Sequence, residues 1–267
     1  MRFNGKYTVV TGGAARIGRS VAEGFLREGA TVAVIDTDRA KGEAFADEYP
    51  GRVYFFCGDV GEKETLESFA AWIRPQFPRV DLLVNNAGIG AGGVVSGCSY
   101  EDFLRIQRVN LAAPYYLTLL LRDCFPEKGG AIVNVSSIRA FQSQPDTEAY
   151  TASKGGVLSL THALAMSFRG RIRVNCVTPA WIRAEDTVRP DTPLYGTTTL
   201  PDHLQYPVGH VGYPHEVAAA IMFLCSEDAS FITGENLMLD GGCARQFIQH
   251  EDFGWRYDPI DPVKGPH

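Results

Sequence analysis

The sequence contains no block of basic residues, and this absence bears first on the partners of the protein. The chain has 31 acidic and 25 basic side chains and a formal net charge of -6. Nucleic acids and anionic membrane surfaces attract clustered Lys and Arg side chains, which are missing here. We therefore expect no nucleic-acid partner and no membrane-surface partner.

Long apolar segments are also absent. The longest runs from Leu111 to Leu121 and includes Thr118, whereas a membrane-spanning helix needs about 20 apolar residues. The N-terminal sequence MRFNGKYTVVTGG enters a strand pattern at once, without the apolar region of a secretory signal. The sequence thus predicts a soluble, cytoplasmic protein.

The six cysteines form no Cys-x-x-Cys pair, and most of them lie inside apolar runs. This distribution favours buried thiols over metal ligands, and we predict no metal site. Internal repeats and low-complexity segments are missing as well. The 267 residues, 45% of them hydrophobic, fit one α/β domain with a large core.

Apolar runs typical of strands alternate with helical patterns along the whole chain. The runs are YTVV, TVAVID, RVYFFCGDV, DLLVNNAG, AIVNVS, RIRVNCVTP and ENLMLDGG. This alternation predicts a doubly wound, Rossmann-like α/β fold with a seven-stranded parallel sheet and helices on both faces. Ligands bind at the carboxyl ends of the strands in such sheets.

We expect residues 1–242 to form a single domain. Inside it, the segment 183–214 is rich in Pro, Thr and Tyr without a sustained period, which predicts a mobile lid over the strand ends. Residues 243–267 form a C-terminal extension. Its Trp255 and Tyr257 favour docking on another surface, and a disordered tail is the alternative.

The first strand leads into the glycine-rich turn TGGAARIG, which a helical pattern follows. Gly12 and Gly18 would let this turn approach a pyrophosphate, which the amides at the helix N-terminus then hold. Asp36 ends the second strand 18 residues after Gly18, where an acidic residue meets the adenosine ribose. A carboxylate there accepts bonds from both ribose hydroxyls and repels a 2′-phosphate, so we predict NAD as the cofactor.

Two further strand ends face the same ligand. Asp59 follows the third strand and is placed to contact the adenine edge. Asn86, Ala87 and Gly88 follow the fourth strand, and small residues are needed where backbone approaches a flat ligand.

The fifth strand and the next helix carry the candidate catalytic residues. Tyr150 and Lys154 stand at i and i+4 on one helix face. The ammonium is expected to lower the pKa of Tyr150, which makes this phenol a candidate general acid and base. Ser137 closes the preceding strand, where its hydroxyl can bind the substrate oxygen whose charge changes.

Asn110 lies within a predicted helix that extends to Phe125. Ser99 and Asp102 resemble a capping box at its start, and Pro114 is expected to kink it. An Asn on an apolar face is costly unless it is hydrogen-bonded. Asn110 is therefore either a satisfied structural residue or part of an active-site relay.

From about Phe3 to Gly242 the chain resembles the short-chain dehydrogenase/reductase family, in which these motifs occur in this order. TGGAARIG corresponds to its cofactor loop, NNAG to its fourth-strand motif and LDGG to its last motif. The resemblance implies an oxidoreductase with a catalytic tetrad and hydride transfer to or from nicotinamide. Tyr150 would exchange the proton, Ser137 would position the substrate oxygen, Lys154 would hold the nicotinamide ribose, and Asn110 would hold a water linking Lys154 to solvent.

The resemblance also completes the expected cofactor site. Its members are Gly12, Arg16, Ile17, Gly18, Asp36, Asp59, Val60, Asn86, Ala87, Gly88, Tyr150, Lys154, Pro179 and Ile182. The chain departs from the pattern at three positions. Arg16 replaces the middle glycine of the loop, Ala180 replaces the usual Gly after Pro179, and Ala184 replaces a Thr, for which Thr187 is a substitute. Arg16 is expected to reach either the pyrophosphate or the substrate.

The expected substrate is a small polar secondary alcohol or ketone, such as a sugar, polyol or hydroxy acid. Arg139, Gln142, Trp181 and Arg183 suggest a polar rim with one aromatic wall, although surface ion pairs are the commoner use of such arginines. The alternatives are reduction of a flat steroid or pterin and a non-catalytic NAD-sensing protein.

We also expect a homotetramer or homodimer. The two helices around the predicted site carry more apolar surface than one side of a sheet can cover. These apolar residues are Leu117, Leu119, Leu120, Leu121, Leu158, Leu160, Leu164 and Met166.

Overall fold

A computed structural model describes residues 1–183 and 198–247 of the chain. Its centre is a sheet of seven parallel strands in the order β3-β2-β1-β4-β5-β6-β7. The strands are β1 (Tyr7–Thr11), β2 (Thr31–Asp36), β3 (Val53–Cys57), β4 (Leu82–Asn85), β5 (Gly130–Val135), β6 (Ile172–Pro179) and β7 (Asn236–Leu239). The predicted doubly wound fold is confirmed.

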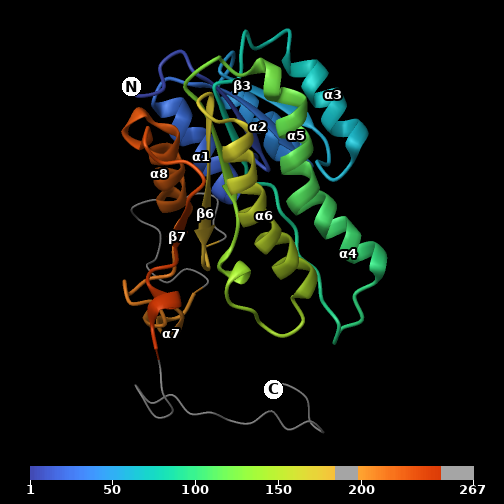
Figure 1. The fold of residues 1–267 in the computed structure, drawn as a ribbon, viewed down its shortest axis with the longest axis vertical. Helices are drawn as coiled ribbons and strands as arrows, with labels where there is room; N and C mark the ends of the chain where they lie inside the picture. Colours follow the sequence, from blue (N-terminus) through green and yellow to red (C-terminus); the bar gives the residue numbers. More distant parts are fainter. Residues whose placement is uncertain (184–197, 248–267) are drawn as a thin grey trace, which may run out of the picture.

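Helices cover both faces of the sheet (Figure 1). They are α1 (Arg16–Arg27), α2 (Arg39–Glu48), α3 (Lys63–Ile73), α4 (Tyr100–Gln107), α5 (Ala113–Leu121), α6 (Glu148–Ser167), α7 (Leu200–Leu204) and α8 (Pro214–Cys225). Five short segments join them: η1 (Arg108–Ala112), η2 (Arg122–Cys124), η3 (Ile138–Ala140), η4 (Glu227–Ala229) and η5 (Cys243–Arg245).

The strands have an apolar side chain on each face, so the sheet separates two cores. On one face Val10 and Val34 pack with Phe25 of α1 and with residues of α2 and α8. On the other face Val9 and Ile35 pack with residues of α3, α5 and α6. Near-continuous apolar strands are typical of parallel sheets that are buried on both sides.

The connections of the sheet place the ligand site. From β1 the chain proceeds outward through β2 and β3, and then returns to β4 on the other side of β1. Ligands bind at such a reversal of strand order, outside the carboxyl ends of the strands. In Figure 1 these ends lie at the lower side of the sheet.

The helix predicted from Ser99 to Phe125 is interrupted. Ser99 caps α4 as expected, and its hydroxyl accepts the Asp102 amide at 3.0 Å. A π-helical segment, η1, then separates α4 from α5. The predicted kink at Pro114 is thus replaced by a π-turn that ends before it, and Pro114 occupies the first turn of α5, where a proline has no amide to lose.

Residues 198–214 of the predicted lid pack on the domain. They include α7, and the side chains of His203, Tyr206 and Val211 are buried. Residues 184–197 of the lid, with Ala184 and Thr187, lie outside the described residues, as do residues 248–267 of the extension. None of the helices in the described ranges combines the length and apolar character that a membrane crossing requires.

Candidate active site

The glycine-rich turn between β1 and α1 has the close packing expected of it. The backbone of Gly12 has a φ of 62°, which glycine adopts without strain. A Cβ on Gly18 would lie 1.9 Å from the Gly12 carbonyl oxygen, and a Cβ on Gly12 would lie 3.0 Å from Ala87 Cα. Side chains at either glycine would therefore push the turn away from the end of β4.

Thr11, which the sequence analysis did not single out, connects this turn to β4. Its hydroxyl accepts the backbone amides of Asn86 and Ala87, both at 3.0 Å. In return, the Asn86 side-chain amide donates to the carbonyls of Thr11 and Gly12 at 3.0 Å. The sequence offered one indication of this role, namely the position of Thr11 directly before the glycine-rich turn.

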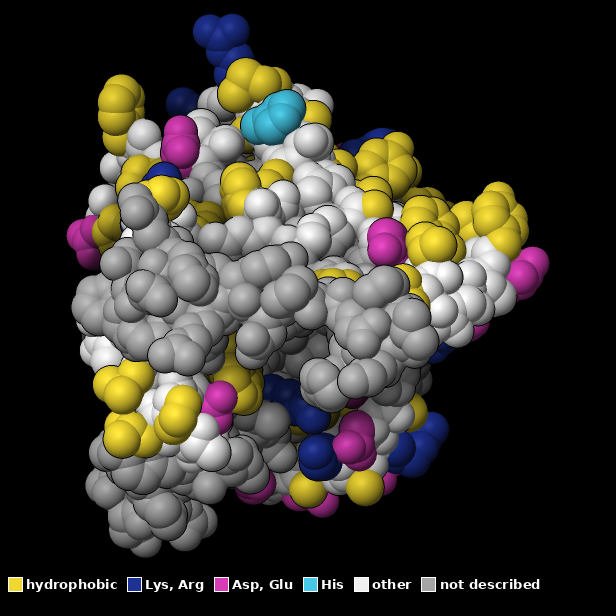
Figure 2. Space-filling model, turned by 90° about the horizontal axis from the view of Figure 1, so that it is seen from below, with side chains coloured by type: hydrophobic (Ala, Val, Ile, Leu, Met, Phe, Trp, Pro, Cys, Tyr) yellow, Lys and Arg dark blue, Asp and Glu magenta, His cyan; other side chains and the backbone are white. Residues whose placement is uncertain are grey.

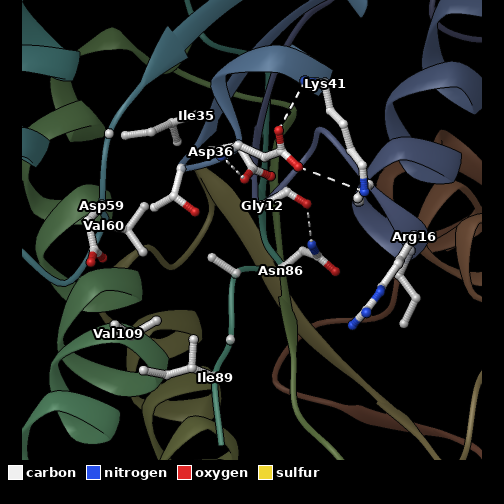
Figure 3. Close-up of a pocket in the computed structure, with 18 of the residues that line it drawn as sticks. Gly12, Arg16, Ile35, Asp36, Lys41, Asp59, Val60, Asn86, Ile89 and Val109 are labelled. Atoms are coloured by element: carbon white, nitrogen blue, oxygen red, sulfur yellow. Dashed lines mark hydrogen bonds and ion pairs between the residues drawn. The ribbon is translucent and has the colours of Figure 1, made fainter. Parts of the chain in front are cut away.

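A cleft of about 440 Å3 runs along the ends of β1 to β4 (Figure 3). Asp36 lines it from the last position of β2, and its two oxygens accept the amides of Ala14 and Asp38 at 3.0 Å. These two bonds hold the carboxylate beside the glycine-rich turn and leave further lone pairs for a ligand. Lys41 also lines the cleft and pairs with Asp38 at 3.8 Å.

Asp59 and Val60 lie at the opposite wall of the cleft (Figure 3). Burial raises the pKa of Asp59, but bonds from the Gly61 amide and from Arg105 outweigh it and hold this pKa below its usual range. The Arg105 guanidinium donates to Asp59 at 2.9 Å. Asp59 is thus oriented by an ion pair with α4, and Arg105 is a second residue that sequence reasoning missed.

Arg16 has an unusual backbone for its residue type. Its φ is 52°, in the left-handed region that the replaced glycine would occupy freely. The side chain is exposed and extends from the start of α1 along the cleft (Figure 3). Arg16 also lines a second, adjoining cleft, so its position is consistent with both predicted roles.

The second cleft has a volume of about 320 Å3 and brings Ser137, Tyr150 and Lys154 together. It shares Arg16, Ile17, Asn86 and Gly88 with the first cleft, and Pro179 and Ile182 line its other side. Figure 2 views this end of the molecule, where Lys and Arg side chains are visible in a recess near the centre of the face. The fourth predicted catalytic residue, Asn110, is not part of the lining.

The predicted lowering of the Tyr150 pKa is wrong for the protein without ligands. Burial raises the pKa of Tyr150, while a hydrogen bond with Ser137 and the charge of Arg139 lower it by less. The helical spacing does place Lys154 near the phenol, with its Nζ 5.5 Å from the ring centroid. The ammonium nevertheless donates to the Val135 carbonyl at 2.9 Å instead of to the phenol.

Lys154 is a buried cation with 3% of its surface exposed. Burial lowers its pKa to about 8, so the ammonium form is retained at neutral pH. A Cβ on Gly88 would lie 3.2 Å from Lys154 Nζ and 3.5 Å from Asn110 Oδ1. The absence of a side chain at Gly88 therefore leaves room beside this ammonium.

Asn110 is fully hydrogen-bonded inside the π-helical segment. Its side-chain amide donates to the Ile89 carbonyl and to Ser153 Oγ, both at 2.9 Å, and its oxygen accepts the Ile89 amide at 2.8 Å. The Ser153 hydroxyl donates to the Tyr150 carbonyl at 2.7 Å. Asn110 thus connects the loop after β4 to α6, the helix of Tyr150. Its side chain has the hydrogen bonds that were expected of a satisfied structural residue.

The predicted polar rim is only partly present. Arg183 is buried, with 2% of its surface exposed, and lies 5.4 Å over the Tyr213 ring. Arg183 is therefore not a surface residue, and it lines the second cleft together with the half-exposed Trp181. Gln142 lines a different pocket, beside β7 and η5.

Comparison with known proteins agrees with this geometry. A family model described as enoyl-(acyl carrier protein) reductase matches residues 12–244. L-fucose dehydrogenase of Bos taurus is 35% identical over 245 residues, which cover 90% of this chain and 90% of that protein.

Two solved structures share the whole fold. One is described as an apo SCOR enzyme from Clostridium thermocellum; it is 40% identical with a TM-score of 0.86, over 97% of this chain and 100% of that one. The other is a short-chain dehydrogenase/reductase from Brucella melitensis described as glucose/ribitol dehydrogenase. It is 31% identical with a TM-score of 0.82, over 91% of this chain and 98% of that one.

Proposed function

The chain belongs to the short-chain dehydrogenase/reductase family of oxidoreductases, and from this premise we propose that it interconverts a secondary alcohol and a ketone with NAD(H). The observation that carries the proposal is the junction of two clefts. The one that Asp36 lines opens, at Asn86 and Gly88, into the one that contains Ser137, Tyr150 and Lys154.

The residues of the first cleft fit a dinucleotide. Gly12 and Gly18 leave the phosphate turn without side chains, and the N-terminus of α1 beside them favours an anion. In our proposal Arg16 and Ile17 complete the phosphate site, Asp36 binds the ribose, and Asp59 and Val60 contact the adenine. The nicotinamide half is held by Asn86, Ala87, Gly88, Tyr150, Lys154, Pro179 and Ile182. When bound, NAD(H) accepts or supplies the hydride.

In our proposal the side chains of the second cleft transfer the proton of the substrate hydroxyl. In the oxidation direction Tyr150 takes the hydroxyl proton of the substrate, and in reduction it returns a proton to the carbonyl oxygen. Ser137, which lines the same cleft, donates to that oxygen. The buried Lys154 ammonium stabilises negative charge that forms nearby, and Asn110 positions the loop and helix on either side.

We propose a sugar, polyol or hydroxy acid as the substrate. The relatives described as acting on L-fucose and on glucose or ribitol support this class. The test is a panel of L-fucose, glucose, ribitol, hydroxy acids and hydroxysteroids with NAD, followed by absorbance of NADH. Turnover with the steroids alone would replace the polar class by an apolar one. Tight NADH binding without turnover of any substrate would point to an NAD-sensing protein.

Asp36 should make the protein prefer NADH over NADPH by at least an order of magnitude in affinity, about 1.4 kcal/mol. The reason is that a 2′-phosphate would face a fixed carboxylate, which accepts the Ala14 and Asp38 amides. Fluorescence titration measures both affinities. Asp36→Ala should narrow the difference mainly by admitting NADPH, while Asp47→Ala, an exposed change on α2, should leave it as it is. Equal affinities in the unaltered protein would refute the argument.

We further propose a homodimer or homotetramer. Leu117, Leu121 and Leu164 are core residues, which removes part of the predicted surplus of apolar surface. Tyr115 of α5 and Met166 of α6 remain 51% and 64% exposed. Sedimentation should therefore give a mass of at least two chains, and Tyr115→Glu combined with Met166→Glu should lower it. A monomer in the unaltered protein would contradict the proposal.

A further inference from the structure

Two loops that are distant in sequence lie side by side at the strand ends (Figure 1). One is the loop of residues 90–98, between β4 and α4. The other is the segment 141–147, which leads into α6 and so precedes Tyr150. Neither takes part in the binding of NAD proposed above. In that proposal Gly88 is the last residue of the loop after β4 that contacts NAD.

Two carboxylates, one at the end of the second segment and one at the start of α6, hold the first loop through its backbone. The four consecutive amides of residues 93–96 all donate to them. Asp146 Oδ1 alone accepts three of these amides, at 2.8 to 2.9 Å. Glu148, the first residue of α6, accepts the Val94 amide at 3.1 Å. Because several amides converge on one ionised oxygen, this contact is stronger than ordinary neutral hydrogen bonds.

The backbone on both sides is adapted to this contact. Asp146 has a φ of 66°, and it and Arg16 are the two described non-glycine residues with positive φ. Strain of this kind persists only where the surroundings enforce it. A Cβ on Gly93 would lie 1.7 Å from Glu148 Oε2, so the loop approaches the carboxylate only because this position is glycine. Hydrogen bonds from the Ser96 backbone, then from its side chain, hold the pKa of Asp146 below its usual range.

The held loop runs beside the candidate acid and base. A Cβ on Gly90 would contact Tyr150 Cδ2 at 3.7 Å, so the loop backbone passes the edge of the phenol ring. Asp146 precedes Tyr150 by four residues and Glu148 precedes it by two. The same short stretch of chain thus presents the phenol and anchors the backbone next to it.

We propose that Asp146, assisted by Glu148, is a positioning residue that fixes residues 90–98 as the wall of the substrate space beside Tyr150. This inference rests on the proposed oxidoreductase function and deepens it, since the wall selects and orients the alcohol or ketone. Binding of NAD is independent of Asp146, because the dinucleotide cleft is lined by other residues.

Two substitutions separate the acceptor from the strained backbone. Asp146→Gly removes the carboxylate while accommodating the positive φ. Asp146→Asn keeps an acceptor oxygen at the Oδ1 position, where all three bonds converge, but removes the charge. With the best sugar or polyol of the panel, Asp146→Gly should lower kcat/KM at least tenfold, mainly through KM, and Asp146→Asn should lower it less. The NADH dissociation constant should stay within twofold in both variants.

Hydrogen exchange of the amides of residues 93–96 reports on the anchor without any turnover. We expect at least tenfold faster exchange in Asp146→Gly, partial protection in Asp146→Asn, and no change in Asp123→Asn, an exposed control in η2. Unchanged exchange in Asp146→Gly would overturn the anchor. Faster exchange with unchanged kcat/KM, or with a parallel loss of NADH affinity, would overturn its role in substrate positioning. If the unaltered protein turned over no substrate, the proposed function would fail and with it this role, while exchange would still decide on the anchor.

Discussion

Tyr150→Phe is expected to lower kcat by about a thousandfold and to leave the affinity for NADH within twofold. The variant keeps the ring that packs beside Gly90 and loses only the hydroxyl, which is the proposed acid and base. A positioned general acid or base contributes roughly 10²- to 10⁴-fold to a rate, or about 3 to 5 kcal/mol of transition-state stabilisation. Steady-state kinetics with the best substrate of the panel, combined with NADH titration, measures both effects.

The matched control is Tyr100→Phe, which removes the hydroxyl of a tyrosine that is 70% exposed at the start of α4. It should retain full activity. If Tyr150→Phe kept more than a tenth of the original kcat, the proton would have to come from another group, and the assignment of Tyr150 would be abandoned.

Lys154→Met is expected to reduce turnover on the order of a hundredfold and, at the same time, to make the folded protein more stable at pH 7. Turnover falls because the variant lacks the cation that stabilises charge near Tyr150. Stability rises because methionine fills a similar volume without a buried charge. A fall of the Lys154 pKa from 10.5 to about 8 corresponds to a burial cost on the order of 3 kcal/mol. The lost bond to the Val135 carbonyl offsets about 1 to 2 kcal/mol of it.

The dependence on pH isolates this effect. The folded-state pKa of Lys154, about 8, lies below the unfolded value of 10.5, so between these values the unfolded chain binds a proton that the folded chain has released. Stability contributed by this group therefore increases as the pH rises from about 8 to 10.5. Urea unfolding at pH 7 and at pH 10 should show the advantage of Lys154→Met at the lower pH and its reduction at the higher one. If the difference in stability between Lys154→Met and the unaltered protein stayed constant with pH, the pKa of Lys154 would not be lowered in the folded protein.

Local periodicity accounts for what could be predicted. Asp36 was found because an apolar strand ends on it, and the pair of Tyr150 and Lys154 was found because helical spacing brings i and i+4 together. Both inferences need only a few neighbouring residues. The doubly wound parallel sheet followed from the alternation of strands and helices, since such chains form parallel sheets with few possible topologies.

The remaining features depend on contacts that leave no local pattern. Asp146 holds Gly93 across 53 residues, and the partners are backbone amides, which every residue type offers. Arg183 is buried against Tyr213, whereas arginines are mostly exposed. The pKa of Tyr150 was predicted from one neighbouring charge, but burial is set by the whole fold and outweighs that charge. The direction of the Lys154 side chain also leaves no local pattern: its ammonium donates to the Val135 carbonyl of β5 and not to the phenol.

The π-helical segment between α4 and α5 also changes the direction in which the side chains of α4 point relative to those of α5. A π-turn accommodates an extra residue within an α-helix, and each residue of an α-helix turns the chain by about 100°. Residues before Arg108 therefore face a direction that a regular helix continuing from α5 would not give them. One consequence is that Arg105 meets Asp59 at the cleft while Leu117 and Leu121 stay in the core. Deletion of one residue from this segment would remove the offset. Either the Arg105 contact with Asp59 or the burial of Leu117 and Leu121 would then be lost.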